Sequence, residues 1–379
     1  MATPRLIFCF HFTFFLTSTY LLPSTLATSK KYYCKYNAIY QFGDSISDTG
    51  NLVRELPIGP LTPFNFLPYG ETYFNKSTGR CSNGKLMIDF IAEALGVPLL
   101  EPYLAVKYIT NNPNSHCGVN FAVAGATALD TGELLEQKII SPLTGSSLSV
   151  QLKWFDNYLS PICSTNCSNE IKRALFMVGE TGGNDYNYAL FLNQTTEELR
   201  PLVPRIVERI INVTESLINR GARRLVVPGN FAIGCLPVYL TFFQSNDSSA
   251  YDSDQCLIDL NAFSQYHNEY LQNAIEKLRA KYRGITILYG DYYNAHLTII
   301  RRAPHLGFER GSELQACCGN GGDYNFGLHS FCATPLARTC LDPDRYISWD
   351  GLHLTQHAYQ NIASSLIKWM KLKHQCIIL

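Results

Sequence analysis

The sequence lacks the signatures of several common catalytic and binding classes. It has no G-x-S-x-G, so an α/β-hydrolase nucleophile elbow loses its main sequence support. It also has no H-E-x-x-H or G-x-G-x-x-G, which weakens zinc-protease and dinucleotide-binding interpretations. No C-x-x-C pair suits structural zinc. Lys plus Arg equals Asp plus Glu at 31 each, and without a basic surplus we expect no nucleic-acid partner.

Long apolar runs are absent after the N-terminus, where no stretch reaches the roughly 20 residues of a membrane span. The N-terminus itself has Arg5, the run LIFCFHFTFFLTSTYLL and then small residues up to Ala27, as secretory signals do. A membrane anchor is the alternative, which His11 and Thr13 weaken. We therefore expect residues 1–27 to be removed, and the mature protein to be secreted or vacuolar without a stable membrane anchor.

Cysteines and glycosylation sequons agree with that compartment. Twelve cysteines follow the signal, an even number as a disulfide framework requires. Cys163/Cys167 and Cys235/Cys256 are the local pairs we favour, although connectivity cannot be read from sequence. Five N-x-S/T sequons predict glycosylation, at Asn75, Asn166, Asn193, Asn212 and Asn246. Asn212 lies in a helical apolar pattern, about 200° around the helix axis from Ile210. We therefore expect it on the solvent face of that helix.

Short apolar runs alternate with helical patterns along the chain, and no repeat or linker divides residues 28–379, which we expect to form one domain. Continuous runs rich in Val, Ile and Phe indicate strands buried on both faces, at 37–43, 175–179, 224–229 and 285–290. Residues 97–104 and 119–125 compete for one more strand. Helices are predicted at 84–96, around Asn212, at 257–282 and after His353. This alternation predicts a parallel, doubly wound α/β sheet.

Small polar residues follow several of these strands. In an open α/β sheet, sites form beyond the carboxyl ends of the strands, so the strand-end loops are candidates. They are GDS at 43–45, AVAGAT at 122–127, GETGGNDY at 179–186 and SWDGLH at 348–353. Together they contain the parts of a serine hydrolase.

A serine hydroxyl becomes a nucleophile when a base, usually His, takes its proton, and the His needs an acceptor that fixes its tautomer. Asp350 and His353 can form such a pair within one turn, with Ser45 as nucleophile. The N–H groups of Ser45 and Gly125 and the amide of Asn184 are the donor types that a developing oxyanion needs.

Other roles are open for neighbouring residues. Asp185 could partner His353 instead of Asp350, although we expect it to shape the loop that presents Asn184. His353 and His357, four residues apart, could form a metal pair, but a lone pair without a carboxylate ligand is more often structural. Asp44 and Asp48 could be catalytic acids. We prefer the alternative that they stabilise the start of a helix, where negative charge and side-chain acceptors are favourable.

Four segments, FGDSISDTGN, NFAVAGAT, GGNDY and WDGLHLT, resemble in order the blocks of the plant GDSL esterase/lipase family, within the SGNH hydrolases. VVPGNFAIGCLP and ACCGNGGDYNF also resemble family segments. The resemblance covers nearly all of the mature chain. It implies a flavodoxin-like three-layer α/β/α sandwich with a central parallel sheet. It also implies ester hydrolysis by Ser45 as nucleophile, His353 as base and Asp350 as its partner, with Ser45, Gly125 and Asn184 as the oxyanion hole.

Two positions depart from the family pattern. Ile46 stands where Leu is common, and Ala232 where Pro is common; the second bears on specificity more than on activity. The segment LPYGETYFNKSTGRCSNGKLMIDFIAEALG resembles the branch that includes esterases of plant specialised metabolites.

We therefore expect a monomeric secreted serine esterase that works through an acyl-enzyme and needs no metal or organic cofactor. The expected substrate is a small-molecule ester with a small acyl group, such as an acetylated alkaloid. An acyltransferase or a lipase using the same site, and a non-catalytic secreted binding glycoprotein, are the alternatives.

Overall fold

A computed structural model describes residues 32–34, 36–106, 117–162, 171–327, 331–370 and 376–378. The predicted signal at 1–27 lies outside these residues. Two units are distinguished, and the larger, Cys34–Cys376, holds the main sheet and all of the predicted catalytic residues. Near the chain ends, β1 (Tyr32–Cys34) and β9 (Cys376–Ile378) form a two-stranded sheet.

Five parallel strands form the main sheet, in the order β3-β2-β4-β5-β6. Their bounds are Gly118–Asn120 (β3), Ile39–Phe42 (β2), Leu175–Val178 (β4), Arg224–Pro228 (β5) and Thr286–Gly290 (β6). The four predicted strands are confirmed. This order, 2-1-3-4-5 among the strands of this sheet, is the flavodoxin-like one.

The fifth strand comes from the second of the two candidates, at residues 118–120. The first candidate, 97–104, makes a single bridge from Pro102 to Asn120 and then turns into the short helix α2 (Tyr103–Val106). Pro98 and Pro102 explain this outcome, because proline has no N–H to donate to a strand ladder.

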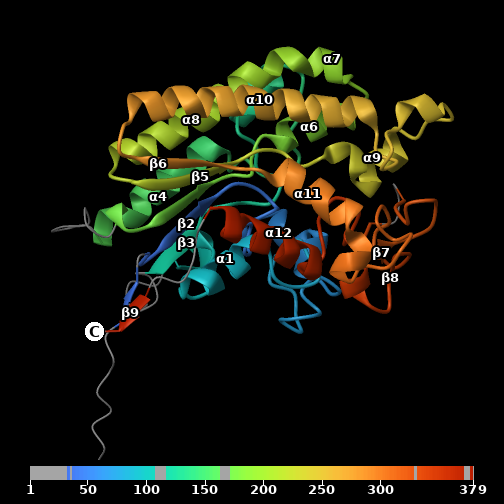
Figure 1. Cartoon of the computed structure of the whole chain (residues 1–379), viewed down its shortest axis with the longest axis horizontal. Helices are drawn as coiled ribbons and strands as arrows, with labels where there is room; N and C mark the ends of the chain where they lie inside the picture. The colour runs from blue at the N-terminus through green and yellow to red at the C-terminus, as the bar shows by residue number, and fades with distance from the viewer. Residues whose placement is uncertain are drawn as a thin grey trace, which may run out of the picture. The chain divides into compact units, whose positions relative to one another are not determined.

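Helices cover both faces of the sheet (Figure 1). On one face α4 and α10 pack against α8, and on the other α1 and α11 pack against α12. Right-handed crossovers produce this division, because the chain moves from β2 to β3 in one direction and from β3 through β6 in the other. The bounds are Met87–Leu95 (α1), Leu148–Ile162 (α4), Val203–Asn219 (α8), Ile258–Lys281 (α10), Tyr292–Arg301 (α11) and Gln356–Trp369 (α12). The three-layer α/β/α fold is therefore confirmed.

Shorter elements complete the unit, and the sequence patterns predicted none of them. The helices are Thr131–Glu136 (α3), Gly183–Leu190 (α6), Thr196–Leu199 (α7) and Pro237–Phe242 (α9), and the antiparallel strands are Cys318–Gly319 (β7) and Arg338–Thr339 (β8). The longer helices α4 and α11 were also unpredicted.

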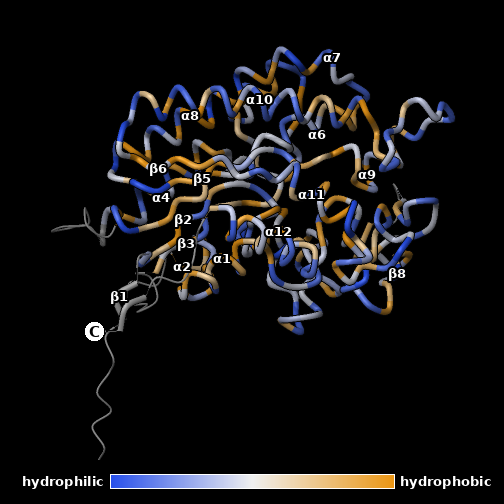
Figure 2. Tube along the Cα trace, in the orientation of Figure 1, coloured by the Kyte–Doolittle hydropathy of each residue, from blue (hydrophilic) through white to orange (hydrophobic). Residues whose placement is uncertain are grey.

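Hydrophobic residues concentrate in the strands and on the inner faces of the helices (Figure 2). In α8 the buried side chains, among them Ile206, Ile210 and Leu217, recur at helical spacing, while Asn212 is exposed as predicted. The other sequon asparagines that the structure describes are exposed too: Asn75, Asn193 and Asn246. Asn166 lies outside the described residues.

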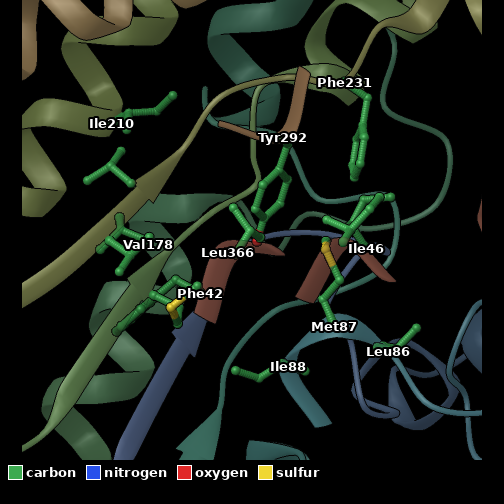
Figure 3. Close-up of a cluster of buried hydrophobic side chains, with 14 of the residues drawn as sticks. Phe42, Ile46, Leu86, Met87, Ile88, Val178, Ile210, Phe231, Tyr292 and Leu366 are labelled. Carbon is green, nitrogen blue, oxygen red and sulfur yellow. The ribbon is translucent and has the colours of Figure 1, made fainter. Parts of the chain in front are cut away.

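The core reaches directly beneath the first strand-end loop. Figure 3 draws part of it, with Phe42 from β2, Ile46 from the turn that follows, Met87 from α1 and Leu366 from α12. Ile46 is therefore an anchor: its buried side chain holds the turn containing Ser45 against the core.

Three disulfides are present among the described residues. Cys235–Cys256 confirms one favoured pair, and Cys317–Cys340 and Cys318–Cys332 staple the loop that carries β7 and β8. Cys163 and Cys167 lie outside the described residues. Cys81 and Cys117 are free thiols, so the even number of cysteines does not mean that every one of them is paired. Within the described ranges no helix is both long enough and apolar enough to span a bilayer.

Candidate active site

The predicted residues gather where the sheet changes direction. The connection after β2 leads to β3 on one side of the sheet, whereas the connection after the neighbouring strand β4 leads to β5 on the opposite side. A crevice opens at such a switch point beyond the carboxyl ends of the two strands. Ser45 follows β2 by three residues, and the segment 179–186 with Asn184 follows β4.

A dense set of hydrogen bonds fixes the turn that carries Ser45. The Asp44 carboxylate accepts the N–H of Ile46 at 3.0 Å. The Asp48 carboxylate accepts four N–H groups at 2.6–3.0 Å, from Gly50, Asn51, Leu52 and Ala124. Gly43 has φ +142°, and a Cβ there would lie 2.6 Å from the carbonyl oxygen of Glu180. The two aspartates thus shape a turn and not the start of an α-helix, which the sequence favoured; the next element is the short 3-10 helix Leu52–Arg54.

His353 and Asp350 form a pair with a defined tautomer. His353 Nδ1 donates to Asp350 Oδ2 at 2.7 Å. Asp350 Oδ1 accepts the N–H groups of Leu352 (3.0 Å) and His353 (2.7 Å), and Tyr69 donates its hydroxyl to Oδ2 at 2.8 Å. Burial opposes ionisation of Asp350, but the His353 ring and these hydrogen bonds hold its pKa below the usual value. With Nδ1 carrying the hydrogen, Nε2 has the free lone pair that a base requires.

That nitrogen is available. His353 Nε2 is buried and has no hydrogen-bond partner among the described residues. Ser45 lines the same pocket as Leu352, the sequence neighbour of His353, and Asp44 beside Ser45 is close enough to His353 for an electrostatic effect on the pKa of Asp44. No hydrogen bond joins Ser45 Oγ to His353 Nε2; catalytic hydrogen bonds of this kind often tighten only when a substrate binds.

The three predicted oxyanion donors differ in whether they already donate a hydrogen bond within the protein. Within the described chain the N–H groups of Ser45 and Gly125 donate no hydrogen bond. Asn184 Nδ2, in the first turn of α6, donates to Ala126 O at 3.0 Å and to Asp44 Oδ2 at 3.2 Å. Two backbone donors are thus free, whereas the amide would have to exchange one partner for an oxyanion.

The alternatives weighed from the sequence have structural roles here. Asp185 does not touch His353: its carboxylate accepts the N–H groups of Ala128 (2.8 Å) and Leu129 (3.0 Å), which ties α6 to the loop after Gly125. Burial raises the pKa of Asp185 to about 7. His357 Nδ1 donates to a backbone carbonyl at 2.6 Å and its ring packs on Phe308. The described residues contain no cluster of three or more His, Cys, Asp or Glu suited to a metal.

A pocket of about 420 Å³, including the space at its open mouth, lies against Ser45. Its lining combines apolar and polar residues. The apolar ones are Ile46, Phe231, Ile233, Leu236, Tyr239 and Leu352, and the polar ones include Asp44, Ser45, Glu180, Asn184, Asn187 and Asn230. Ala232, the departure from the family pattern, lies between two lining residues.

Sequence reasoning assigned no role to Tyr69, Glu180 or Asn230. Tyr69 is 281 residues from its partner Asp350, so no local pattern connects them. Glu180 and Asn230 follow the ends of β4 and β5, and the strand-end rule could have found both. Burial raises the pKa of Glu180 well above its usual range, and the charge of Asp44 and a hydrogen bond between the two carboxyl groups add to this.

Comparison with known proteins gives consistent matches. The model of the GDSL-like lipase/acylhydrolase family matches residues 39–366. Acetylajmalan esterase 1 of Rauvolfia serpentina is 46% identical over 342 residues, which cover 90% of this chain and 88% of that protein. A GDSL esterase/lipase of Arabidopsis thaliana is 43% identical over 359 residues, covering 94% and 91% of the two chains. A second acetylajmalan esterase of Rauvolfia serpentina is 46% identical over 336 residues, covering 88% and 85%.

Proposed function

The chain belongs to the GDSL-like lipase/acylhydrolase family and is a carboxylic ester hydrolase, and we propose that Ser45, His353 and Asp350 carry out the reaction. The observation that supports this assignment best is the 2.7 Å hydrogen bond from His353 Nδ1 to Asp350, which leaves Nε2 without a partner beside the Ser45 pocket. That arrangement is what a general base acting on a serine hydroxyl needs.

In the proposed first step, Ser45 Oγ bonds to the ester carbonyl carbon while its proton moves to His353 Nε2. Asp350 stabilises the imidazolium that forms. When the tetrahedral intermediate collapses, the bond to the alcohol oxygen breaks and the alcohol leaves with the proton from Nε2. Water then attacks the acyl-enzyme by the same route, and the acid is released.

The tetrahedral oxyanion needs donors, and the N–H groups of Ser45 and Gly125 support this role because both are unused. We assign the third donor to Asn184. Its 3.2 Å hydrogen bond to Asp44 is the longer of its two, and is the one that an oxyanion would replace.

For the substrate we propose a small-acyl ester of a plant specialised metabolite, such as an acetylated alkaloid. The names of the acetylajmalan esterases, at 46% identity over most of this chain, support the acetyl group. We also propose a single-domain monomer that enters the secretory pathway, is glycosylated there and stays in the vacuole or leaves the cell. Exposed sequons and three disulfides support that route.

A lipase is the second candidate, and one observation favours it. The segment before α1 exposes a run of large apolar side chains: Leu56, Ile58, Leu61, Phe66 and Leu67. Phe64 in the same segment contacts the His353 ring edge to face, with centroids 5.7 Å apart. An apolar surface beside the base would suit a lipid interface.

A series of p-nitrophenyl esters from acetyl to palmitoyl tests both proposals. We expect kcat/KM to be highest for acetyl or butyryl esters, because a small acyl pocket excludes long chains. A rise toward palmitoyl, steepest above the solubility limit, would establish the lipase instead. Ser45→Ala, as a variant control, should lose ~10⁴-fold or more of the activity while folding normally. Retention of most activity by this variant would disprove the nucleophile assignment.

A further inference from the structure

Two buried acceptor atoms in the Ser45 pocket have no hydrogen-bond partner within the described chain: Glu180 Oε1 and Asn230 Oδ1. The two residues are only 5% and 4% exposed. A buried acceptor without a partner is destabilising, and native proteins retain few of them. Two such atoms in one pocket, beside the proposed nucleophile, point to a ligand that donates hydrogen bonds.

Both residues are held in place by hydrogen bonds. The backbone of Asn230 is clamped by Asn268, which accepts its N–H at 2.7 Å and donates to its carbonyl oxygen at 3.0 Å. The carboxyl group of Glu180 hydrogen-bonds to Asp44, which in turn accepts from Ile46 and Asn184. A ligand would meet acceptors whose positions are already set, so little ordering would be needed on binding.

The charge of the pocket selects among possible donors. Its lining includes two carboxyl groups, Asp44 and Glu180, and no Lys or Arg. Asp185 is a third buried carboxyl group close to both, and burial raises the pKa of Asp44 and of Asp185 to about 7. A neutral hydroxyl would satisfy the free acceptors, whereas only a cation would also stabilise the ionised form of these carboxyl groups. A protonated amine satisfies both requirements.

The apolar wall of the pocket fits the same ligand. Phe231, which Figure 3 shows extending from the segment after β5, and Tyr239 both line the pocket. Aromatic rings attract cations through their negative faces, and this attraction strengthens when water is excluded. Tyr239 directs its hydroxyl to Asn187.

We propose that Glu180, with Asn230, recognises a basic nitrogen in the alcohol part of the ester by accepting a hydrogen bond from the protonated amine. The inference rests on the proposed function: an acetyl group contains no nitrogen, so a basic nitrogen in the substrate must belong to the alcohol part. Glu180 is thereby a specificity-determining residue, distinct from the groups that act on the ester bond.

Two acetates of nearly identical shape test this proposal. 2-(Dimethylamino)ethyl acetate is still protonated near pH 7, and 3-methylbutyl acetate replaces its nitrogen by CH. Acetylcholine, as a third probe, has the charge without an N–H. The proteins are the full-length secreted enzyme, Glu180→Gln, which preserves side-chain shape, and Glu101→Gln, an exposed glutamate outside the pocket, as the matched control.

We expect the wild type to prefer the aminoester over the neutral ester by about 10- to 100-fold in kcat/KM, the range of a hydrogen bond to a charged group. Glu180→Gln keeps an acceptor oxygen but cannot ionise, so it should lose most of this preference: its kcat/KM for the aminoester should fall at least tenfold further than its kcat/KM for the neutral ester. Glu101→Gln should retain the preference. Acetylcholine should fall between the two acetates, since it lacks the N–H.

Two results would overturn the inference: no preference in the wild type, or an equal loss for both acetates in Glu180→Gln, which would make Glu180 a positioning residue for Asp44. If the wild type hydrolyses none of the esters, the proposed function fails. Binding of 2-(dimethylamino)ethanol against 3-methylbutanol, by saturation-transfer NMR, then decides the inference separately. Weaker binding of the amino alcohol to Glu180→Gln than to the wild type, with unchanged binding of 3-methylbutanol, would support the inference. Equal binding of the amino alcohol to the wild type and to Glu180→Gln would refute it.

Discussion

Asp350→Asn should nearly abolish turnover, because the hydrogen bonds of Asp350 dictate how an asparagine would have to sit. Oδ1 accepts two backbone N–H groups, from Leu352 and His353, so the amide oxygen of the variant must remain there. The amide nitrogen then replaces Oδ2, where Tyr69 and His353 Nδ1 now donate. An NH₂ group cannot accept either hydrogen.

The imidazole relieves this conflict by moving its hydrogen to Nε2, so that Nδ1 accepts from the amide. A protonated Nε2 cannot take the proton of Ser45. Loss of the correct tautomer in a serine triad lowers kcat by ~10⁴, which is about 5 kcal/mol of transition-state stabilisation. KM should change little, because Asp350 lies behind the ring and does not line the pocket.

The assay is steady-state hydrolysis of p-nitrophenyl acetate near pH 7, with the thermal midpoint and near-UV circular dichroism as folding controls. Asp344→Asn is the matched variant, since Asp344 is exposed in the same loop and should retain full activity. A loss of less than about 100-fold in a folded Asp350→Asn enzyme would refute the tautomer reasoning and with it the assignment of Asp350.

Three further predictions follow from individual groups. Asn184→Ala should lower kcat by roughly 10²–10³ with little change in KM, as loss of one oxyanion donor does; an effect on KM alone would make Asn184 a substrate contact. Burial lowers the pKa of His296 to about 4, below its unfolded value of about 6.5, so its contribution to stability is present above pH 6.5 and is lost as the pH falls toward 4. The drop in unfolding free energy from pH 7 to 5, measured in urea, should therefore be about 2 kcal/mol smaller in His296→Gln, and equal drops would contradict this. Endoglycosidase treatment of protein made in a eukaryotic host should reduce its mass, with one step fewer in Asn212→Gln; an unchanged mass and a retained N-terminal segment would exclude the secretory route.

Some of the fold followed from local patterns. The buried strands β2, β4, β5 and β6 are continuous apolar runs, a property that any strand covered on both faces must have. The fifth strand could not be assigned in this way, because residues 97–104 and 119–125 are similarly apolar. Competition for one sheet edge, and the prolines in the first segment, decided between them. The helices α6 and α9 are short, and too few residues recur in them for a helical period to stand out.

Asp350 and His353 were predictable as a pair, because three residues of separation place them within one turn whatever surrounds them. The proposed roles of Ser45, Gly125 and Asn184 came from strand-end position and family resemblance, and the sequence alone determined that much. Only the tertiary structure brought Tyr69 to Asp350 across 281 residues, tied Asp185 to the loop after Gly125, and left Glu180 and Asn230 without partners beside Ser45. The physical reason is that hydrogen bonds between distant segments, and the burial that leaves an acceptor unpaired, depend on how the layers pack.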